Sequence, residues 1–228
     1  YLTKRSLLRN ARYEYLITRS PDVRGIDVAL LYSPMTFRLI NSYPLRVAPL
    51  KGMRPTRDIL YASGEVLGGD TLHVFVLHAP SRFSGKRASA PYRMAVMRRL
   101  MQSVDSLRSI HREPKIIVSG DFNDESEDES VRFLANNGLA EVSAGVKGMN
   151  GAKGTYKYQG VWGSIDHILI SGGMKPLFRR CILNDLPFLL EDDSKFGGKK
   201  PFRTYWGYRY LGGFSDHLPL VAVFEFGL

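Results

Sequence analysis

The chain has 228 residues, of which 44% are hydrophobic, so it can form one substantial globular domain and is not a disordered chain. Lysine and arginine number 32 against 22 acidic residues, and the net charge of +10 favours anionic partners such as nucleic acid or phosphorylated headgroups. Cys181 is the only cysteine, which excludes an intrachain disulfide and a Cys/His zinc site, and no apolar run approaches the ~18 residues that span a bilayer.

Hydrophobic periodicity predicts a mixture of strands and helices. A basic helical stretch opens the chain at residues 2–9, and two further helices are expected at 90–110 and 128–137. Alternation and β-branched content predict strands at 13–17, 26–32, 36–48, 57–67, 71–78, 115–119, 154–159, 163–170, 177–183 and 218–226. No internal repeat or linker divides the chain, so we expect a single domain over residues 1–228.

The strand predicted at 115–119 is followed by Gly120, Asp121 and Asn123. Gly120 lets the chain turn sharply, so that the two polar side chains project from the carboxyl end of the strand, where open α/β sheets place their active sites. On local grounds alone, the same residues fit a strand-to-loop turn in which Asp and Asn cap backbone donors equally well.

A second pair of polar residues supports the functional interpretation. Asp166 stands among apolar residues of a predicted strand, and a buried carboxylate needs a partner. We expect His217 to be that partner, because a carboxylate that accepts from one ring nitrogen favours the imidazolium and aims the other nitrogen at substrate. A lone Asp on a strand would more often be a satisfied structural group.

The strand predicted at 71–78 carries two histidines, His73 and His78. Their separation is odd, so the two side chains point to opposite faces of the strand. We expect a structural role for His73, part-way along the strand, and a role in the site for His78 at its carboxyl end.

Residues 184–215 show no clean period and contain many aromatic side chains. A loop of this length is usually functional or disordered. It runs directly into Asp216 and His217, so that Tyr205 and its neighbours could form one wall of a substrate site on which bases stack. Packing of the rings onto the sheet edge explains them equally well. Arg203 is a sharper candidate, because a guanidinium can hold a phosphate bidentately.

Four motifs in this order resemble those of the endonuclease/exonuclease/phosphatase superfamily, typified by deoxyribonuclease I and the apurinic endonucleases. The motifs are His78–Ser81, Gly120–Asn123, Ser164–His167 and Ser215–His217. The resemblance covers about 21–226 and implies an α/β fold, a four-layer sandwich of two mainly antiparallel sheets flanked by helices. Further stretches at 24–32, 201–205 and 212–216 resemble a bacterial subgroup, which implies a secreted or periplasmic protein.

The resemblance also implies that the N-terminal strands are missing. Members of the superfamily begin with a strand bearing an Asn and a strand ending in a metal-binding Glu, whereas this sequence opens on the basic stretch at 2–9. We therefore expect the chain to be the carboxyl-terminal two thirds of a larger protein, with one sheet incomplete and poor catalysis by this chain alone.

By resemblance, Asp121 takes a proton from the attacking water, and Asn123 orients that water or helps to hold a metal. His217, kept protonated by Asp166, donates to the phosphate oxygens. His78 is implied as a second phosphate donor or leaving-group acid. The implied metal ligands are Asp216, Asp121 and Asn123, and the candidate substrate-binding residues are Arg24, Ser81, Arg203 and Tyr205. Oxygen ligands favour Mg²⁺, with Mn²⁺ or Ca²⁺ as alternatives.

Three functions are compatible with these residues. The first is a metal-dependent phosphodiester hydrolase of nuclease type acting on nucleic acid. The second is a phosphatase or phosphodiesterase acting on lipid headgroups or small phosphoesters. The third is a non-catalytic fragment that binds polyanions through its excess positive charge.

Overall fold

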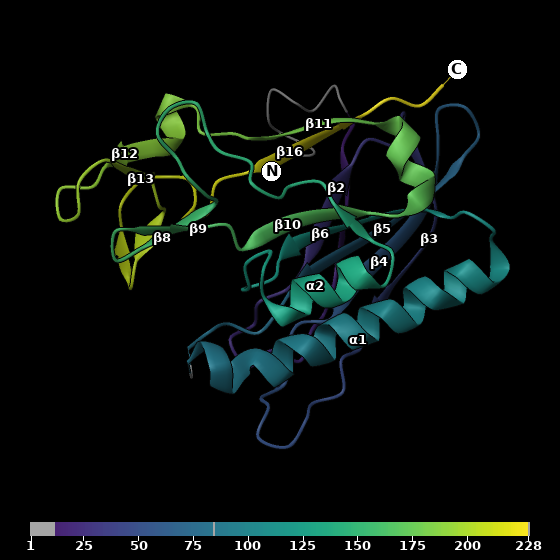
Figure 1. Ribbon diagram of the computed structural model, residues 1–228, viewed down its shortest axis with the longest axis horizontal. Coiled ribbons are helices and arrows are strands. Elements are labelled where there is room, and N and C mark those ends of the chain that lie inside the picture. The colour runs from purple at the N-terminus through teal and green to yellow at the C-terminus, as the bar shows by residue number, and fades with distance from the viewer. Residues whose placement is uncertain (1–11, 84, 228) are drawn as a thin grey trace.

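A six-stranded sheet forms the centre of the molecule in the computed structural model, which describes residues 12–83 and 85–227 (Figure 1). Its strand order is β3-β4-β5-β6-β10-β7, and the β5–β6 pair is parallel while the other pairs are antiparallel. The strands are β3 (Phe37–Leu45), β4 (Ile59–Val66), β5 (Thr71–His78), β6 (Lys115–Asp121), β7 (Ala140–Glu141) and β10 (Asp166–Ile170). The expected α/β class is confirmed.

Helices α1 (Lys86–Ile110) and α2 (Glu129–Asn136) lie together on one face of this sheet (Figure 1). The apolar face of α1 buries Met97, Leu100 and Val104 against the sheet, as its helical spacing predicts. The helix begins one turn before the expected start at residue 90. Arg93 explains this earlier start, since its guanidinium is buried and donates to the carbonyl of Lys86 at 2.8 Å, in the first turn.

The opposite face carries two separate strand pairs, where the resemblance implies a second, incomplete sheet. They are β1 (Glu14–Ile17) with β2 (Ala29–Tyr32), and β11 (Phe178–Leu183) with β16 (Leu220–Phe224). Both pairs bury apolar side chains against the central sheet, but within residues 12–83 and 85–227 no ladder of hydrogen bonds joins one pair to the other. The helix expected at 2–9 lies outside the described residues.

Short hairpins replace two of the expected elements. The strand expected at 163–170 is divided into β9 (Val161–Gly163) and β10, because β8 (Tyr156–Tyr158) and β9 form a hairpin with positive φ at both turn residues, Gln159 and Gly160. Residues 184–215 are not one irregular loop. They contain the short helix η3 (Pro187–Leu189) and two hairpins, which consist of β12 (Leu190–Asp192) with β13 (Lys199–Pro201) and β14 (Tyr205–Trp206) with β15 (Arg209–Tyr210). A further short helix, η2 (Gly172–Leu177), precedes β11.

A buried lysine fastens the first of these hairpins to β8. The ammonium of Lys157 pairs with Asp193 at 2.9 Å and donates to the carbonyls of Gly197 and Lys199 at 2.8 and 3.1 Å. Both side chains of the ion pair are about 95% buried, so the pair is desolvated but fully hydrogen-bonded. The hairpin of β12 and β13 is therefore fixed against β8.

The register of the central strands aligns three polar residues. His78 on β5 lies opposite Asp121 on β6, and Asp121 lies opposite Asp166 on β10. Gly120 permits this alignment: its φ is +142°, and a Cβ there would lie 1.9 Å from the carbonyl oxygen of Leu77. A side chain at this position would therefore force β5 and β6 apart.

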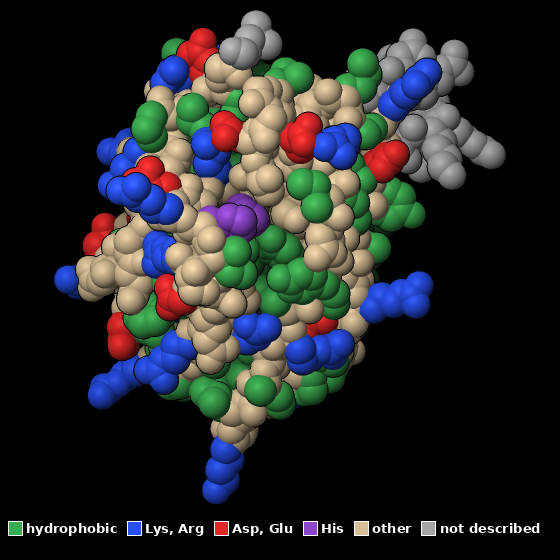
Figure 2. Space-filling model, turned by 90° about the vertical axis from the view of Figure 1, so that its right-hand side faces the viewer, with side chains coloured by type: hydrophobic (Ala, Val, Ile, Leu, Met, Phe, Trp, Pro, Cys, Tyr) green, Lys and Arg blue, Asp and Glu red, His purple; other side chains and the backbone are tan. Residues whose placement is uncertain are grey.

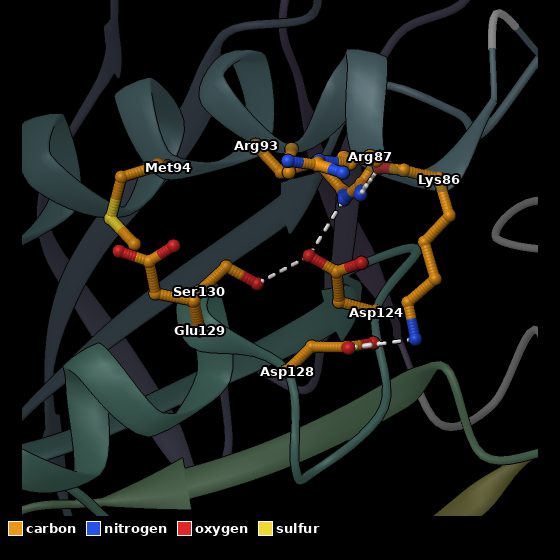
Figure 3. A pocket seen from close by; sticks show the side chains of 9 residues that line it. Lys86, Arg87, Arg93, Met94, Asp124, Asp128, Glu129 and Ser130 are labelled. Carbon is orange, nitrogen blue, oxygen red and sulfur yellow. Dashed lines mark hydrogen bonds and ion pairs between the residues drawn. The ribbon is translucent and has the colours of Figure 1, made fainter.

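The loop after β6 is anchored to both helices through Asp124 (Figure 3). The carboxylate of Asp124 pairs with the buried Arg93 of α1 at 2.7 Å and accepts from Ser130 of α2 at 2.7 Å. Lys86 pairs with Asp128 at 2.7 Å in the same region. The loop that carries Asn123 is thus held from the helix side.

His167 holds the same loop from the sheet side. Its ring is buried, with Nδ1 2.7 Å from Glu141 and Nε2 2.7 Å from the carbonyl oxygen of Asp124. Burial opposes the charged form of both side chains, but their mutual hydrogen bond outweighs it, so the pKa of His167 is raised and that of Glu141 is lowered. The protonated ring donates to both partners.

We predict that Gly120→Ala lowers the unfolding free energy by about 2 kcal/mol or more, because the new methyl group meets the Leu77 carbonyl and the backbone conformation disfavours a side chain. Urea denaturation measures this loss. Gly172→Ala is the matched control, since nothing lies within 4 Å of a Cβ at that position. Equal midpoints for the two variants would contradict the predicted clash.

We predict that His167→Gln destabilises the fold by about 3 kcal/mol, because it leaves Glu141 buried without its cationic partner. The raised pKa of His167 makes its contribution complete below pH 6.5, the ordinary value, and the contribution is lost as the pH rises through the folded-state pKa. The contribution of Glu141 is complete above pH 4.5 and is lost as the pH falls through its lowered pKa.

Urea denaturation of wild type and His167→Gln across this pH range tests the assignment. The difference in unfolding free energy between the two proteins should be largest between about pH 4.5 and 6.5. A difference that grows as the pH is raised above this window would show that His167 is buried in its neutral form.

Candidate active site

The Asp166–His217 pair is formed as expected. Nδ1 of His217 lies 2.7 Å from the Asp166 carboxylate, and the ring packs on Tyr156 with centroids 4.8 Å apart. Burial alone would lower the pKa of His217, but the hydrogen bond and charge of Asp166 outweigh it and raise the pKa to about 9. His217 is therefore an imidazolium at neutral pH, with Nε2 left to donate.

Asp121 and Asn123 are held in one rigid turn. The Asp121 carboxylate accepts from the backbone N–H of Asn123 at 2.8 Å and from its Nδ2 at 3.1 Å, and Nδ2 also donates to the carbonyl of Ala79. These bonds use the amide nitrogen, so the amide oxygen is the atom left for a ligand. Asn123 has a φ of +52°, a left-handed conformation that Asn tolerates. Burial and the charge of Asp166 raise the pKa of Asp121 to about 6.

His78 is next to Asp121 but differs electrostatically from His217. Its Nε2 lies 3.3 Å from the Asp121 carboxylate and is hydrogen-bonded to the guanidinium of Arg57. Burial and the charge of Arg57 lower the pKa of His78 to about 3, so the ring is neutral. A histidine with a lowered pKa does not suit the expected role of leaving-group acid. The neutral ring can instead accept a hydrogen bond from Arg57, which fixes the position of the ring.

Arg57 was not among the residues singled out from the sequence. Its side chain is 97% buried and pairs with Asp22 at 3.5 Å, and it reaches the site from a position two residues before β4. No local signal marks it, because an Arg between Thr56 and Asp58 reads as an ordinary surface residue until the strands are assembled. Arg24, a candidate for substrate binding, is half-exposed beside Asp22 and adds positive charge near Arg57.

A cavity of about 680 Å³ opens beside these groups. His217, Asn123 and Ser81 contribute to its wall, as does Asp216, which is exposed. The hairpin of β8 and β9 forms the aromatic part of the wall through Tyr156, Tyr158 and Trp162. Ser81 lines this cavity, and its predicted role in substrate binding stays a prediction. The aromatic wall formed by the hairpin was not predicted from the sequence.

Arg203 and Tyr205 lie farther along the same wall. The guanidinium of Arg203 stacks on Trp206 at 4.8 Å and lies beside the hydroxyl of Tyr156. Tyr205 is on β14, where its ring contacts that of Tyr210 edge-on at 5.3 Å. Arg203 is therefore connected to His217 through Tyr156, whereas the ring of Tyr205 contacts Tyr210 on the next strand.

The candidate metal ligands of the site are all oxygen donors. Within residues 12–83 and 85–227, no group of three or more His, Cys, Asp and Glu side chains is placed to hold a metal ion. Magnesium typically binds through one or two carboxylates together with water and substrate phosphate. Asp121, Asp216 and the amide oxygen of Asn123 are the candidate donors for such a small set. The pKa of Asp121 is raised by its burial and by the charge of Asp166, and a bound cation would oppose both effects.

Comparisons with known proteins support the resemblance inferred from the four motifs. A family model described as Endonuclease/Exonuclease/phosphatase family matches residues 1–225. A search of curated protein sequences gave no significant match. In the described part of the chain, no helix is long and apolar enough to cross a membrane.

Several solved structures share the fold. The catalytic domain of human nocturnin with bound sulfate is 17% identical, with a TM-score of 0.62 and coverage of 99% of this chain and 78% of that one. A mannosyl-6-phosphatase from Bacteroides thetaiotaomicron is 18% identical, with a TM-score of 0.62 and coverage of 94% and 77%. A functionally unknown conserved protein from Enterococcus faecalis is 19% identical, with a TM-score of 0.62 and coverage of 93% and 77%.

At these identities the structural matches show a common fold, while the family model matches almost the whole sequence. Together with the ordered motifs, these findings show that the chain belongs to the endonuclease/exonuclease/phosphatase family of hydrolytic phosphoesterases.

Proposed function

We propose that this chain carries the active site of a metal-dependent phosphodiesterase that acts on nucleic acid. The observation that carries the proposal is the row of polar groups across β5, β6 and β10. In this row Asp121, whose pKa is raised, lies between the neutral His78 and Asp166, and Asp166 holds the protonated His217. A carboxylate base next to a fixed imidazolium suits the attack of water on phosphate.

In the proposed reaction, water attacks phosphorus and the bond from phosphorus to the leaving oxygen breaks. Asp121 accepts the proton of the attacking water, and the amide oxygen of Asn123 orients that water. His217 donates from Nε2 to a non-bridging phosphate oxygen, on which negative charge builds in the transition state. Asp166 keeps the ring protonated and fixes its direction, and Arg57 holds His78 in place.

Asp216, Asp121 and Asn123 are the residues that would hold the metal, with Mg²⁺ favoured over Mn²⁺ and Ca²⁺ because all donors are oxygen. When bound, the ion would neutralise charge on the phosphate. The chain's own contribution is to place Asp216 and Asn123 on the wall of the cavity that His217 also lines, with Asp121 hydrogen-bonded to Asn123.

Nucleic acid is favoured as substrate by the net charge of +10 and by the aromatic wall beside the site. A phosphatase or phosphodiesterase acting on small phosphoesters or lipid headgroups is the second candidate, and one structural neighbour is described as a mannosyl-6-phosphatase. A polyanion-binding role without catalysis is the third, supported by the charge alone. The secreted or periplasmic location implied by the subgroup resemblance stays a prediction.

We predict that His217→Ala lowers kcat for a phosphodiester by at least ~100-fold, because it removes the donor to the developing charge. Asp166→Asn should give a smaller loss of the same kind, since the imidazolium loses its partner. Steady-state kinetics measure both effects, and His111→Ala, at the C-cap of α1, is the control. Wild-type rates in both site variants would show that the Asp–His pair is not catalytic.

We predict that hydrolysis stops in excess EDTA and returns on addition of Mg²⁺, because the carboxylates and amide at the cavity cannot neutralise phosphate charge by themselves. Initial rates with bis(p-nitrophenyl) phosphate and with plasmid DNA measure the effect. Mn²⁺ and Ca²⁺ are compared at equal concentration. Undiminished turnover in the chelator would rule out the metal-dependent mechanism.

A further inference from the structure

The hairpin of β14 and β15 carries the densest group of exposed aromatic side chains beside the cavity. Tyr208 at its tip is fully exposed, and Tyr205, Trp206 and Tyr210 are each more than half exposed. Soluble domains seldom leave aromatic rings grouped in this way without a partner. The proposed reaction uses none of these four side chains, so their exposure needs another explanation.

The base of this hairpin is tied to the catalytic histidine. The backbone N–H of Phe214 donates to the carbonyl of Phe202 at 2.7 Å, and the hydroxyl of Thr204 donates to the carbonyl of Phe214 at 2.6 Å. A Cβ on Gly213 would lie 2.3 Å from the Phe202 carbonyl oxygen, so the two segments are in close contact. His217 lies only a few residues beyond, and the hairpin is therefore held at a fixed place beside the cavity.

Side chains continue this connection along one face. Trp206 is covered on one side by the guanidinium of Arg203 at 4.8 Å, Arg203 adjoins Tyr156, and Tyr156 packs on His217. Trp206 also lies opposite Arg209 in the β14–β15 register, so the two share a face of the hairpin. Aromatic rings and guanidinium groups therefore form a continuous series from His217 to the hairpin of β14 and β15.

We propose that this face, formed by Arg203, Trp206 and Arg209 with Tyr208 at the tip, is a stacking platform for unpaired bases of a single-stranded nucleic acid. The proposal rests on the proposed nucleic-acid substrate and adds where the strand leaves the cavity. An aromatic ring accepts any base on its π-face, and the arginines bind the intervening phosphates. Duplex bases are already stacked on one another and cannot use the rings in this way.

Charge and composition favour this partner over a membrane. Tyrosine and tryptophan also occur at membrane interfaces, but interfacial segments bury leucine or phenylalanine among the acyl chains as well, and the hairpin 205–210 contains only tyrosine, tryptophan, glycine and arginine. On the face of the molecule drawn in Figure 2, the described Lys and Arg side chains form no single patch. Figure 2 shows the end of the molecule away from the β8 and β9 labels of Figure 1, where Lys and Arg side chains are scattered among acidic ones.

Binding is tested without turnover, so that failure of the proposed reaction does not decide the result. The Asp121→Asn chain, in EDTA, is titrated with a fluorescein-labelled thymidine oligonucleotide of about 12 nucleotides. In this background Trp206→Ala should weaken binding by about 5- to 100-fold, and Tyr208→Ala should also weaken it, because stacking on each ring is lost. Trp206→Phe should restore most of the affinity.

Matched controls separate stacking from charge and from loss of structure. Tyr15→Ala removes a ring of similar exposure on β1 and should leave oligonucleotide binding unchanged. Inorganic polyphosphate carries charge without bases, so Trp206→Ala should not alter its affinity. Arg209→Ala should weaken both ligands and reduce the salt dependence of binding. Circular dichroism confirms that each variant is folded.

Three results would overturn the proposal. The first is unchanged oligonucleotide affinity in both Trp206→Ala and Tyr208→Ala. The second is an equal loss of polyphosphate binding in Trp206→Ala, which would assign the ring a structural role. The third is that the wild type binds phosphatidylcholine–phosphatidylglycerol vesicles tightly, and that Trp206→Ala loses this binding but keeps its affinity for the oligonucleotide. This result would assign the hairpin to a lipid surface.

Discussion

The close approach of β5 to β6 at Gly120 is the constraint on which the site depends. Because the strands meet backbone to backbone there, His78, Asp121 and Asp166 stand side by side on three neighbouring strands. The side-chain period of a strand is two residues, so a slip of one residue in any of these pairs would turn a site residue to the other face. The polar row is thus a property of the sheet register and not of one loop.

This row places two carboxylates side by side in a partly buried setting, which is unfavourable unless cations accompany them. The imidazolium of His217 stabilises Asp166, and Arg57 stands behind His78 at the other end. The pKa of Asp121, between them, is raised because burial and the neighbouring charge of Asp166 outweigh the favourable charges of His217 and Arg57. Asp121 therefore binds a proton more readily than an ordinary Asp, as a base must.

Much of this arrangement could be predicted from the sequence, and what was missed has physical reasons. The strand of β5 and the pairing of Asp166 with His217 follow from local alternation and from the need of a buried carboxylate for a partner. Arg57 and the Glu141–His167 pair were not found in this way, because no motif marks Arg57 or Glu141 and only the folded sheet shows which histidine each one contacts. The hairpins in 184–215 were missed because strands of two or three residues show no period.

The two faces of the hairpin of β8 and β9 contact different parts of the molecule. Tyr156 and Tyr158 face the cavity, while Lys157 between them turns to Asp193 and holds the neighbouring hairpin. Insertion of a single residue within β8 would exchange the two faces, sending the ammonium into the cavity and the rings toward the anchor. Related chains should therefore vary freely in the turn at 159–160 yet keep the length of β8. Replacing this turn with a different one would change the entrance of the cavity without displacing the residues that line it.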